Sequence, residues 1–319
     1  MKHPFVLAYG MGVDSTAIIV GLVARKMRPD LIMFADVGGE RDETYAYLAV
    51  INAYLEFNGF PKVTVVKYVP KNFKHWPPYY TLEENCLTNG TLPSKAFGFG
   101  SCSLKWKAAP QHAYVKKWAP AVEAWARGEK VLKAIGYDCS TRDVQRREKA
   151  DKFTSTYQDT FADFYEYWYP LQEWGWDRDR CMAEIATAGL PVPAKSSCFF
   201  CPAMKPAEVD TLPKDKLKRI VLMETRAKPR LRTVEGLWRK ATKKRPGSMT
   251  EYIAKQGLLT ADEIANVQRV PTELRSYQES FAAGETKQAF TQFVTEILAA
   301  PKLDAGEPSP QQDSVPAER

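Results

Sequence analysis

Four short apolar runs alternate with stretches of helical spacing along the first half of the chain. The runs have the length of buried strands and are Phe5–Tyr9, Leu31–Ala35, Val63–Tyr68 and Val131–Tyr137. Apolar spacing between the first three predicts helices over Ala17–Met27 and Glu40–Phe57. Strands that alternate with helices in this way form right-handed parallel units. We therefore predict an α/β fold with a doubly wound, mostly parallel sheet.

The rest of the chain is less regular. Residues 70–110 are rich in proline, glycine and aromatic residues, which is typical of a long functional loop. Helical spacing returns over Gln111–Arg127 and Arg178–Ala188. We predict three parts, which are an α/β domain over residues 1–210, a helical basic region over 211–300 and a disordered, apolar-poor tail over 301–319.

Composition and charge narrow the classes of protein. The 319 residues are 45% hydrophobic and 26% charged, as in globular proteins, and the longest apolar run is far shorter than a membrane span of about 20 residues. We expect a cytoplasmic protein with no membrane partner. Lys214–Arg245 holds 13 basic against three acidic residues, while the whole chain has a net charge of only +7. This stretch is a solvated helical face or a surface for a polyanion such as nucleic acid.

The cysteines indicate a metal centre. Cys198 and Cys201 have the two-residue spacer that lets two thiolates reach one metal ion or cluster. The alternatives are a pair of buried inert thiols or a redox pair. Cys102 and Cys181 are the better candidates for two further ligands. Spacing alone does not choose between them and the remaining two cysteines, Cys86 and Cys139.

A strand end followed by glycines and hydroxyl residues predicts an anion site. Gly10 and Gly12 let backbone N–H groups turn toward an anion, and Ser15 and Thr16 add hydroxyl donors where the next helix begins. Open α/β sheets bind their ligands at this carboxyl edge. The alternative is a tight turn without a ligand.

Several motifs resemble one superfamily. Gly10-Met11-Gly12-Val13-Asp14-Ser15 resembles the Ser-Gly-Gly-x-Asp-Ser loop of the PP-loop ATP pyrophosphatases, in particular the phosphoadenosine phosphosulfate reductase-like branch. Further segments resemble motifs of that branch, in its order: Asp-Thr-Gly-x-Glu at Phe34–Glu40, Cys-x-x-x-x-Lys at Gly100–Lys107, Ile-Gly at Ile135–Asp138, Pro-Leu-x-x-Trp at Tyr169–Trp174 and the terminal cysteine pair at Lys195–Pro202. The resemblance covers about residues 4–210 and implies a PP-loop, HUP-like sheet.

The resemblance also implies roles for the matching residues. The phosphates of ATP would lie on the loop Gly10, Met11, Gly12, Val13, Asp14, Ser15 and Thr16. Asp14 would orient this loop or help to hold Mg²⁺, and Asp36 would lie beside the ribose or adenine. Gly136 would let the base approach the fourth strand. The implied reaction is attack of a substrate on the α-phosphorus, which releases pyrophosphate and leaves an adenylylated intermediate. Asp14, Ser15 and Lys105 are the candidate catalytic residues, and Arg142 and Arg146 are candidate phosphate clamps.

Relatives with a cysteine-held cluster handle sulfur or resemble the phosphorothioation proteins of DNA-modification systems. On this analogy, Cys102, Cys181, Cys198 and Cys201 would hold a [4Fe–4S] cluster, or structural Zn²⁺, and sulfur would pass to an adenylylated substrate. A sulfur donor protein would then be a further partner, and nucleic acid would bind through Lys214–Arg245.

Two departures from the family pattern favour other functions. Met11 replaces a usual glycine and puts a bulky side chain beside the phosphate path, which favours a non-catalytic nucleotide- or nucleic-acid-binding module with structural zinc. A phosphoadenosine phosphosulfate reductase proper is a second alternative. Such a reductase carries its nucleophilic thiol near the C-terminus, and this chain has no cysteine after Cys201.

Overall fold

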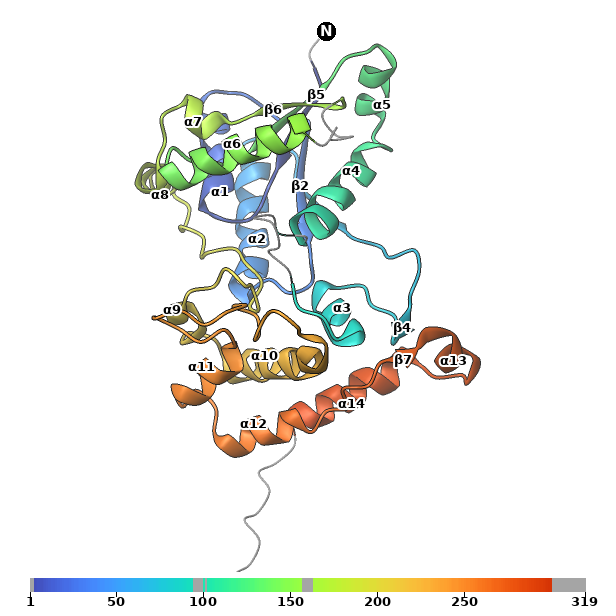
Figure 1. Ribbon diagram of the computed structural model, residues 1–319. Helices are drawn as coiled ribbons and strands as arrows, with labels where there is room; N and C mark the ends of the chain where they lie inside the picture. Colours follow the sequence, from blue (N-terminus) through green and yellow to red (C-terminus); the bar gives the residue numbers. More distant parts are fainter. Residues whose placement is uncertain (1–2, 94–99, 101, 157–162, 300–319) are drawn as a thin grey trace, which may run out of the picture.

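The sheet at the centre of the molecule is parallel throughout (Figure 1). The computed structural model describes residues 3–93, 100, 102–156 and 163–299. The five strands of the sheet are β1 Phe5–Ala8, β2 Leu31–Asp36, β3 Val63–Lys67, β5 Val131–Ile135 and β6 Tyr165–Trp168. They pair in the order β3-β2-β1-β5-β6, and every pairing is parallel. The prediction of a mostly parallel α/β fold is confirmed, with β6 as a strand that the pattern had not indicated.

Alternate side chains of each strand enter different cores. Leu7 and Phe34 pack on one face with the helices α1 (Val13–Ala24), α2 (Asp42–Phe57) and α8 (Arg178–Thr187). Val6 and Met33 pack on the other face with α4 (Ala109–Val115) and α5 (Ala119–Ala126). Because both faces are covered, the strands are buried on both sides and appear in the sequence as continuous apolar runs.

The chain reverses direction across the sheet between β1 and β5. From β1 it proceeds outward through β2 to β3, and it then returns to β5 and continues to β6 on the other side. Neighbouring parallel strands whose connections leave in opposite directions form the crevice where such sheets bind ligands. The segment after β1 and the segment after β5, which leads into α6 (Thr141–Thr156), therefore border the expected ligand site.

Residues 70–110 are not one long loop. They contain β4 (His75–Trp76), α3 (Leu82–Asn89) and the π-helix η2 (Ser103–Ala108), which continues into α4. A capping box begins α3, since Thr81 accepts from the Glu84 N–H and the Glu84 carboxylate accepts from the Thr81 N–H. The predicted helix over Gln111–Arg127 is also wrong in its continuity. It is broken between α4 and α5, where a proline occupies the first turn of α5.

A helical body lies against the sheet half (Figure 1). Two helices that pack in the sheet half, α7 (Pro170–Glu173) and α8, precede this body in the chain. The elements of the helical body are α9 Pro206–Val209, α10 Lys214–Ala227, the 3₁₀ turn η3 Lys228–Arg230, α11 Met249–Lys255, α12 Ala261–Gln268, β7 Arg275–Ser276, α13 Tyr277–Ala282 and α14 Lys287–Ala299. It has its own core, to which α3 also contributes Leu82 and Leu87. The strand β7 pairs with β4 from the first half of the chain. The predicted tail, 301–319, lies outside the described residues.

The basic stretch Lys214–Arg245 is helical only in its first half. The helix α10 and the turn η3 end at Arg230, and residues 231–248 form turns. The α-helix ends at Ala227, two residues before Pro229, which cannot donate an α-helical hydrogen bond. None of the helices in the described part of the chain combines the length and apolar composition that a bilayer span requires.

Candidate active site

The glycine loop, which is residues 9–12 together with the first turn of α1, directly follows β1. Met11 has a φ of +58°, a conformation that favours glycine, and its side chain is fully buried in the core beneath α1. The sequence had placed a bulky side chain beside the phosphate path. That interpretation is wrong, because the left-handed turn directs the side chain of Met11 into the protein. The feature that favoured a non-catalytic module is thereby removed.

The hydroxyl groups of the loop are engaged within the protein. The Ser15 hydroxyl accepts from the Gly10 N–H at 3.1 Å and donates to the Gly12 carbonyl at 3.1 Å. The Thr16 hydroxyl contacts the Tyr9 hydroxyl, and both Ser15 and Thr16 are buried. No side chain caps α1 among the described residues, so the N–H groups of its first turn have no partner within the helix. The groups left for an anion are therefore backbone N–H groups, at the positive end of the helix.

Three carboxylates meet beside this loop. Oxygen atoms of Asp14, Asp138 and Asp143 lie within 4.8 Å of one another, and both Asp138 and Asp143 are buried. In the described part of the chain they form the only group of three or more candidate metal ligands that close together. Asp14 comes from the first turn of α1, and the other two follow β5. Carboxylate oxygens are the ligands that Mg²⁺ prefers, and phosphates and water complete its shell.

The environment of Asp14 combines burial with charges of both signs. Burial raises the pKa of Asp14 above its ordinary value, Asp138 and Asp143 raise it further, and the Arg178 guanidinium opposes them. Arg178 donates to Asp14 at 2.7 Å, and Arg146 donates to Asp143 at 2.8 Å. Repulsion among the carboxylates is thus only partly balanced by protein cations, and a bound divalent cation would relieve it.

Planar groups stack next to the carboxylates. The rings of Tyr137 and Tyr169 are nearly parallel, with centroids 5.7 Å apart and planes inclined by 10°. The Arg146 guanidinium covers Tyr137 at 4.6 Å, and the Arg147 guanidinium covers Tyr169 at 4.7 Å. Both arginines come from α6, so this helix places two guanidinium groups over the pair of tyrosine rings at the rim of the site. Arg142 is exposed on the same helix and, among the described residues, forms no hydrogen bond or ion pair with the three carboxylates.

Gly136 packs against the glycine loop. A Cβ atom at this position would lie 3.1 Å from the Ser15 nitrogen and 3.3 Å from the Asp14 carbonyl carbon. The end of β5 is therefore in close contact with the loop, and the approach of a base at Gly136 stays a prediction. Asp36, at the end of β2, is held from three sides. Burial alone would raise the pKa of Asp36. Hydrogen bonds from the Gly38 N–H and the Tyr45 hydroxyl, together with the ion pair to Lys67, lower it below its ordinary value.

The candidate metal ligands do not all lie in one core. Cys102, Cys198 and Cys201 lie in or against the core of the helical body, where burial raises the pKa of Cys102 and of Cys198. Cys86, from α3, belongs to the same core, and burial raises its pKa as well. Cys181 lies apart, buried against α1 in the core of the sheet half, where its charged neighbours are Asp14 and Asp138. The structure therefore places Cys86 in the core that contains Cys198, and it places Cys181, which the sequence had suggested, in the other core.

Lys107, and not Lys105, reaches the cysteines. Lys105 is exposed and lies 5.1 Å above the ring of Tyr68. Lys107 donates to the fully buried carboxylate of Glu40 at 2.9 Å. Burial alone would lower the pKa of Lys107, but Glu40 and then Cys198 raise it. The signal was present in the sequence, because counting Cys-x-x-x-x-Lys from Cys102 ends at Lys107.

The carboxylate of Glu40 is only half satisfied. Its Oε1 atom accepts from Lys107, while its Oε2 atom is buried without a hydrogen-bond partner among the described residues. Glu40 also forms a β-bridge with Cys198, and the Phe199 N–H donates to the Gly39 carbonyl. Burying an acceptor without a donor costs free energy of folding, and beside Cys198 this oxygen would accept a proton or a bound cation.

One segment links the two halves of the site. Residues 195–200 carry Cys198 and pair with the segment after β2. The same segment places Ser196 against the phosphate loop, since a Cβ atom at Gly12 would lie 2.9 Å from the Ser196 hydroxyl oxygen. The loop and the cysteine centre are thus neighbours at the carboxyl edge of the sheet.

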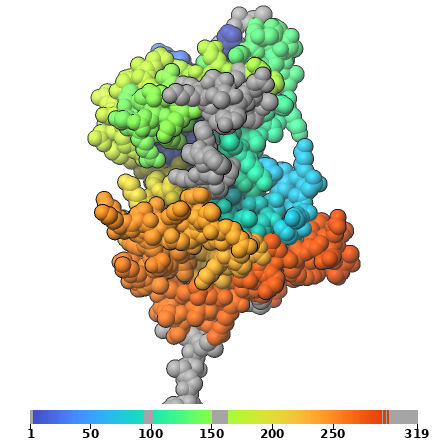
Figure 2. Space-filling model, viewed as in Figure 1, coloured from blue at the N-terminus to red at the C-terminus, as the bar shows by residue number. Residues whose placement is uncertain are grey.

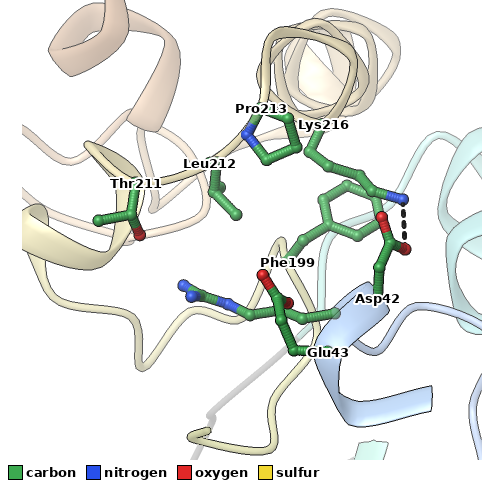
Figure 3. Close-up of a pocket in the computed structure, with 8 residues that line it drawn as sticks. Asp42, Glu43, Phe199, Thr211, Leu212, Pro213 and Lys216 are labelled. Carbon is green, nitrogen blue, oxygen red and sulfur yellow. Dashed lines mark hydrogen bonds and ion pairs between the residues drawn. The ribbon is translucent and has the colours of Figure 1, made fainter. Parts of the chain in front are cut away.

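A shallow pocket marks the seam between the sheet half and the helical body (Figure 3). It lies between the first turns of α2 and α10, with Phe199 beside it. Lys216 of α10 donates to Asp42 of α2 at 3.1 Å across this seam. The pocket contains no residue that the sequence had suggested for catalysis or cofactor binding. Its lining residues instead fix the helical body next to the cysteine segment.

Comparison with known proteins returned no match, either to a protein-family model or to a curated protein sequence. A function for this chain is therefore argued from its motifs and from the geometry of the site.

Proposed function

We propose that the protein is a PP-loop nucleotide-dependent enzyme of the phosphoadenosine phosphosulfate reductase-like family. An acceptor atom attacks the α-phosphorus of ATP, the bond between the α- and β-phosphates breaks, and pyrophosphate leaves. The acceptor is then adenylylated, and its hydrolysis or displacement releases AMP. The observation that carries this proposal is the meeting of Asp14, Asp138 and Asp143 beside the uncapped first turn of α1.

Each part of the site suits that reaction. The backbone N–H groups that begin α1 suit the phosphates, and the three carboxylates suit Mg²⁺. Mg²⁺ would neutralise charge on the phosphates and on the leaving pyrophosphate. Arg178 and Arg146 are each bound to one of the carboxylates and would add positive charge beside bound phosphates. Positioning and charge neutralisation supply most of the catalysis in phosphoryl-transfer enzymes.

Pyrophosphate release tests this proposal. We expect release from ATP and Mg²⁺ in the presence of candidate acceptors. Asp14→Ala should reduce it on the order of 100-fold, because it removes a carboxylate from the metal site. Asp262→Ala, which removes an exposed carboxylate from α12, is the matched control and should leave release unchanged. Release that is absent, or equal in all three proteins, would contradict the enzyme.

The proposal includes a metal centre at four cysteines. Burial raises the pKa of Cys86, of Cys102 and of Cys198, so these ligands need a positive centre to remain thiolates. Tetrahedral Zn²⁺ at 2.3 Å from sulfur needs sulfur atoms about 3.8 Å apart. No three cysteine sulfurs in the described part of the chain lie within 4.8 Å of one another. A tetrahedral zinc site is therefore not preassembled at these cysteines, and the proposal takes the [4Fe–4S] cluster that the resemblance implies as its centre.

The cluster would supply sulfur chemistry at the edge of the nucleotide site. Cys86, Cys102, Cys198 and Cys201 would hold it, and Lys107 with Glu40 would set the charge around it. Sulfur from a donor protein would reach the adenylylated acceptor at this edge. The segment that joins Ser196 to Cys198 makes the two centres adjacent.

A further inference from the structure

The turn Arg239–Arg245 is the most basic segment of the helical body. Five of its seven residues are lysine or arginine, and none is acidic. Lys240, Lys243 and Lys244 are exposed. In the described part of the chain, no carboxylate forms an ion pair with these three lysines. Their charge is therefore available to a partner.

Most basic side chains of the other half are engaged within the protein. Lys214 and Lys218 both pair with Glu263, and Lys216 pairs with Asp42. Arg219 binds Glu83 through two bonds of 2.6 and 2.7 Å. Arg226 and Arg230 keep their charge but are committed to backbone carbonyl groups near residues 271–273. The structure therefore divides the stretch into α10 with η3, whose basic residues mostly serve the fold, and a turn whose lysines do not.

The basic turn is held in one shape. The Arg245 guanidinium lies 4.5 Å above the ring of Trp238, whose indole N–H donates to the Met204 carbonyl at 2.8 Å. The Thr242 N–H donates to the Arg245 carbonyl at 2.8 Å and closes the turn. Trp238 is buried in the core that also contains Cys198. The protein therefore fixes the backbone of the turn before a partner binds, so less backbone conformational entropy is lost on binding.

We propose that the turn Arg239–Arg245 docks the phosphate backbone of a nucleic acid. This inference rests on the proposed function in one respect, since it names nucleic acid as the acceptor class. The turn carries no large apolar side chain, which a membrane-binding basic segment needs as a second anchor. The helix α6 and the segment around residues 230–245 lie on the same face of the molecule (Figure 2).

The stack on α6 favours nucleic acid over other polyanions. Guanidinium planes and tyrosine rings are surfaces on which unpaired bases stack. Arg146 and Arg147 present such planes at the rim of the nucleotide site. A strand held at the basic turn would thus meet a stacking surface next to the carboxylates. An acidic protein would use the charge but not the planar groups.

Binding measured without nucleotide tests the docking surface. Fluorescence anisotropy would follow a labelled 30-nucleotide single strand, as DNA and as RNA, between 50 and 300 mM salt. The variant Lys240→Gln, Lys243→Gln, Lys244→Gln should lower the salt slope by about 2 and weaken binding at low salt about 10-fold or more. The matched control removes three lysines elsewhere in the helical body, with Lys214→Gln, Lys218→Gln and Lys255→Gln, and should bind like the wild type.

The outcomes separate this inference from the enzymatic one. Equal binding by both triple variants and the wild type, or an equal loss in both variants, overturns it. Binding to vesicles with anionic lipid but not to either strand assigns the turn to membranes and also overturns it. Asp14→Ala should bind the strand normally, because it lies outside the basic turn. If strand binding fails while pyrophosphate release persists, the acceptor belongs to another class. If release fails while binding follows the lysines, the surface stands without the enzyme.

Discussion

Single residues decide which cysteines could serve the proposed metal centre. Cys181 and Cys86 are both buried cysteines on helices, and the sequence analysis preferred Cys181 although spacing alone does not choose between them. The structure separates them, since Cys86 lies in the core with Cys198 and Cys201, and Cys181 lies beneath α1. The distinction is visible only after α3 has packed against α10, because residues far apart in the sequence form the core that contains Cys86 and Cys198.

This distinction predicts opposite results for two similar variants. Cys86→Ala should lose most of the iron and the visible absorption of anaerobically purified protein, because one of four ligands is removed. Cys181→Ala should retain both, and at a fully buried position it should cost only the small transfer and cavity terms of one sulfur atom. Metal analysis and a visible spectrum of each protein measure the outcome. A colourless wild-type protein with zinc would replace the cluster by zinc, and loss of metal in Cys181→Ala alone would reverse the assignment.

At the scale of elements, the loop between β1 and α1 depends on its contact with β5. Gly136→Ala would place a Cβ atom 3.1 Å from the Ser15 nitrogen, so the loop must move by a few tenths of an ångström. Such a shift displaces Asp14 and the N–H groups that begin α1. We expect the variant to fold with nearly unchanged thermal stability, while pyrophosphate release falls about 10-fold or more, because small misplacements are costly in catalysis.

The same substitution far from the loop controls for this effect. Gly257 follows α11 in the helical body, and a Cβ atom there would have no heavy atom within 4 Å. Its positive φ makes Gly257→Ala costly in stability, but the variant should release pyrophosphate at close to the wild-type rate. Equal losses in both variants would show that the contact between β5 and the loop does not position the site.

The elements also show how far the sequence could lead. Continuous apolar runs predicted four of the five parallel strands, because buried parallel strands are apolar on both faces. The helix α3 was missed among prolines and aromatic residues, although the Thr81 and Glu84 pair was a readable start signal. The direction of Met11 and the pairing of Lys107 with Glu40 depend on a positive φ and on packing between distant segments. Neither the direction of Met11 nor the choice of Glu40 as the partner of Lys107 can be read from the local sequence.

At the scale of the whole molecule, the helical body is not simply the last third of the chain. The helix α3 comes from the first hundred residues and packs in the same core as α10. Glu83 of α3 is buried, and Arg219 of α10 holds it with two short bonds. Burial raises the pKa of Glu83 even with Arg219 beside it. The domain boundary predicted at residue 210 stays a prediction. The ion pair between Glu83 and Arg219 connects residues that lie on opposite sides of that boundary in the sequence.

Removal of Arg219 tests whether these segments fold as one unit. Arg219→Met would leave a buried carboxylate without its partner, and we expect about 3 kcal/mol less stability at neutral pH. A carboxyl group with a raised folded pKa is most favourable when protonated, so the deficit relative to the wild type should shrink as pH falls through that pKa. Lys218→Met, on the same helix as Arg219, breaks a pair with Glu263 of α12 and should cost less than about 1 kcal/mol. Urea unfolding at several pH values measures both variants. A deficit that is constant with pH, or equal in the two variants, would mean that Glu83 does not depend on Arg219 and that α3 and α10 are held together by their apolar contacts alone.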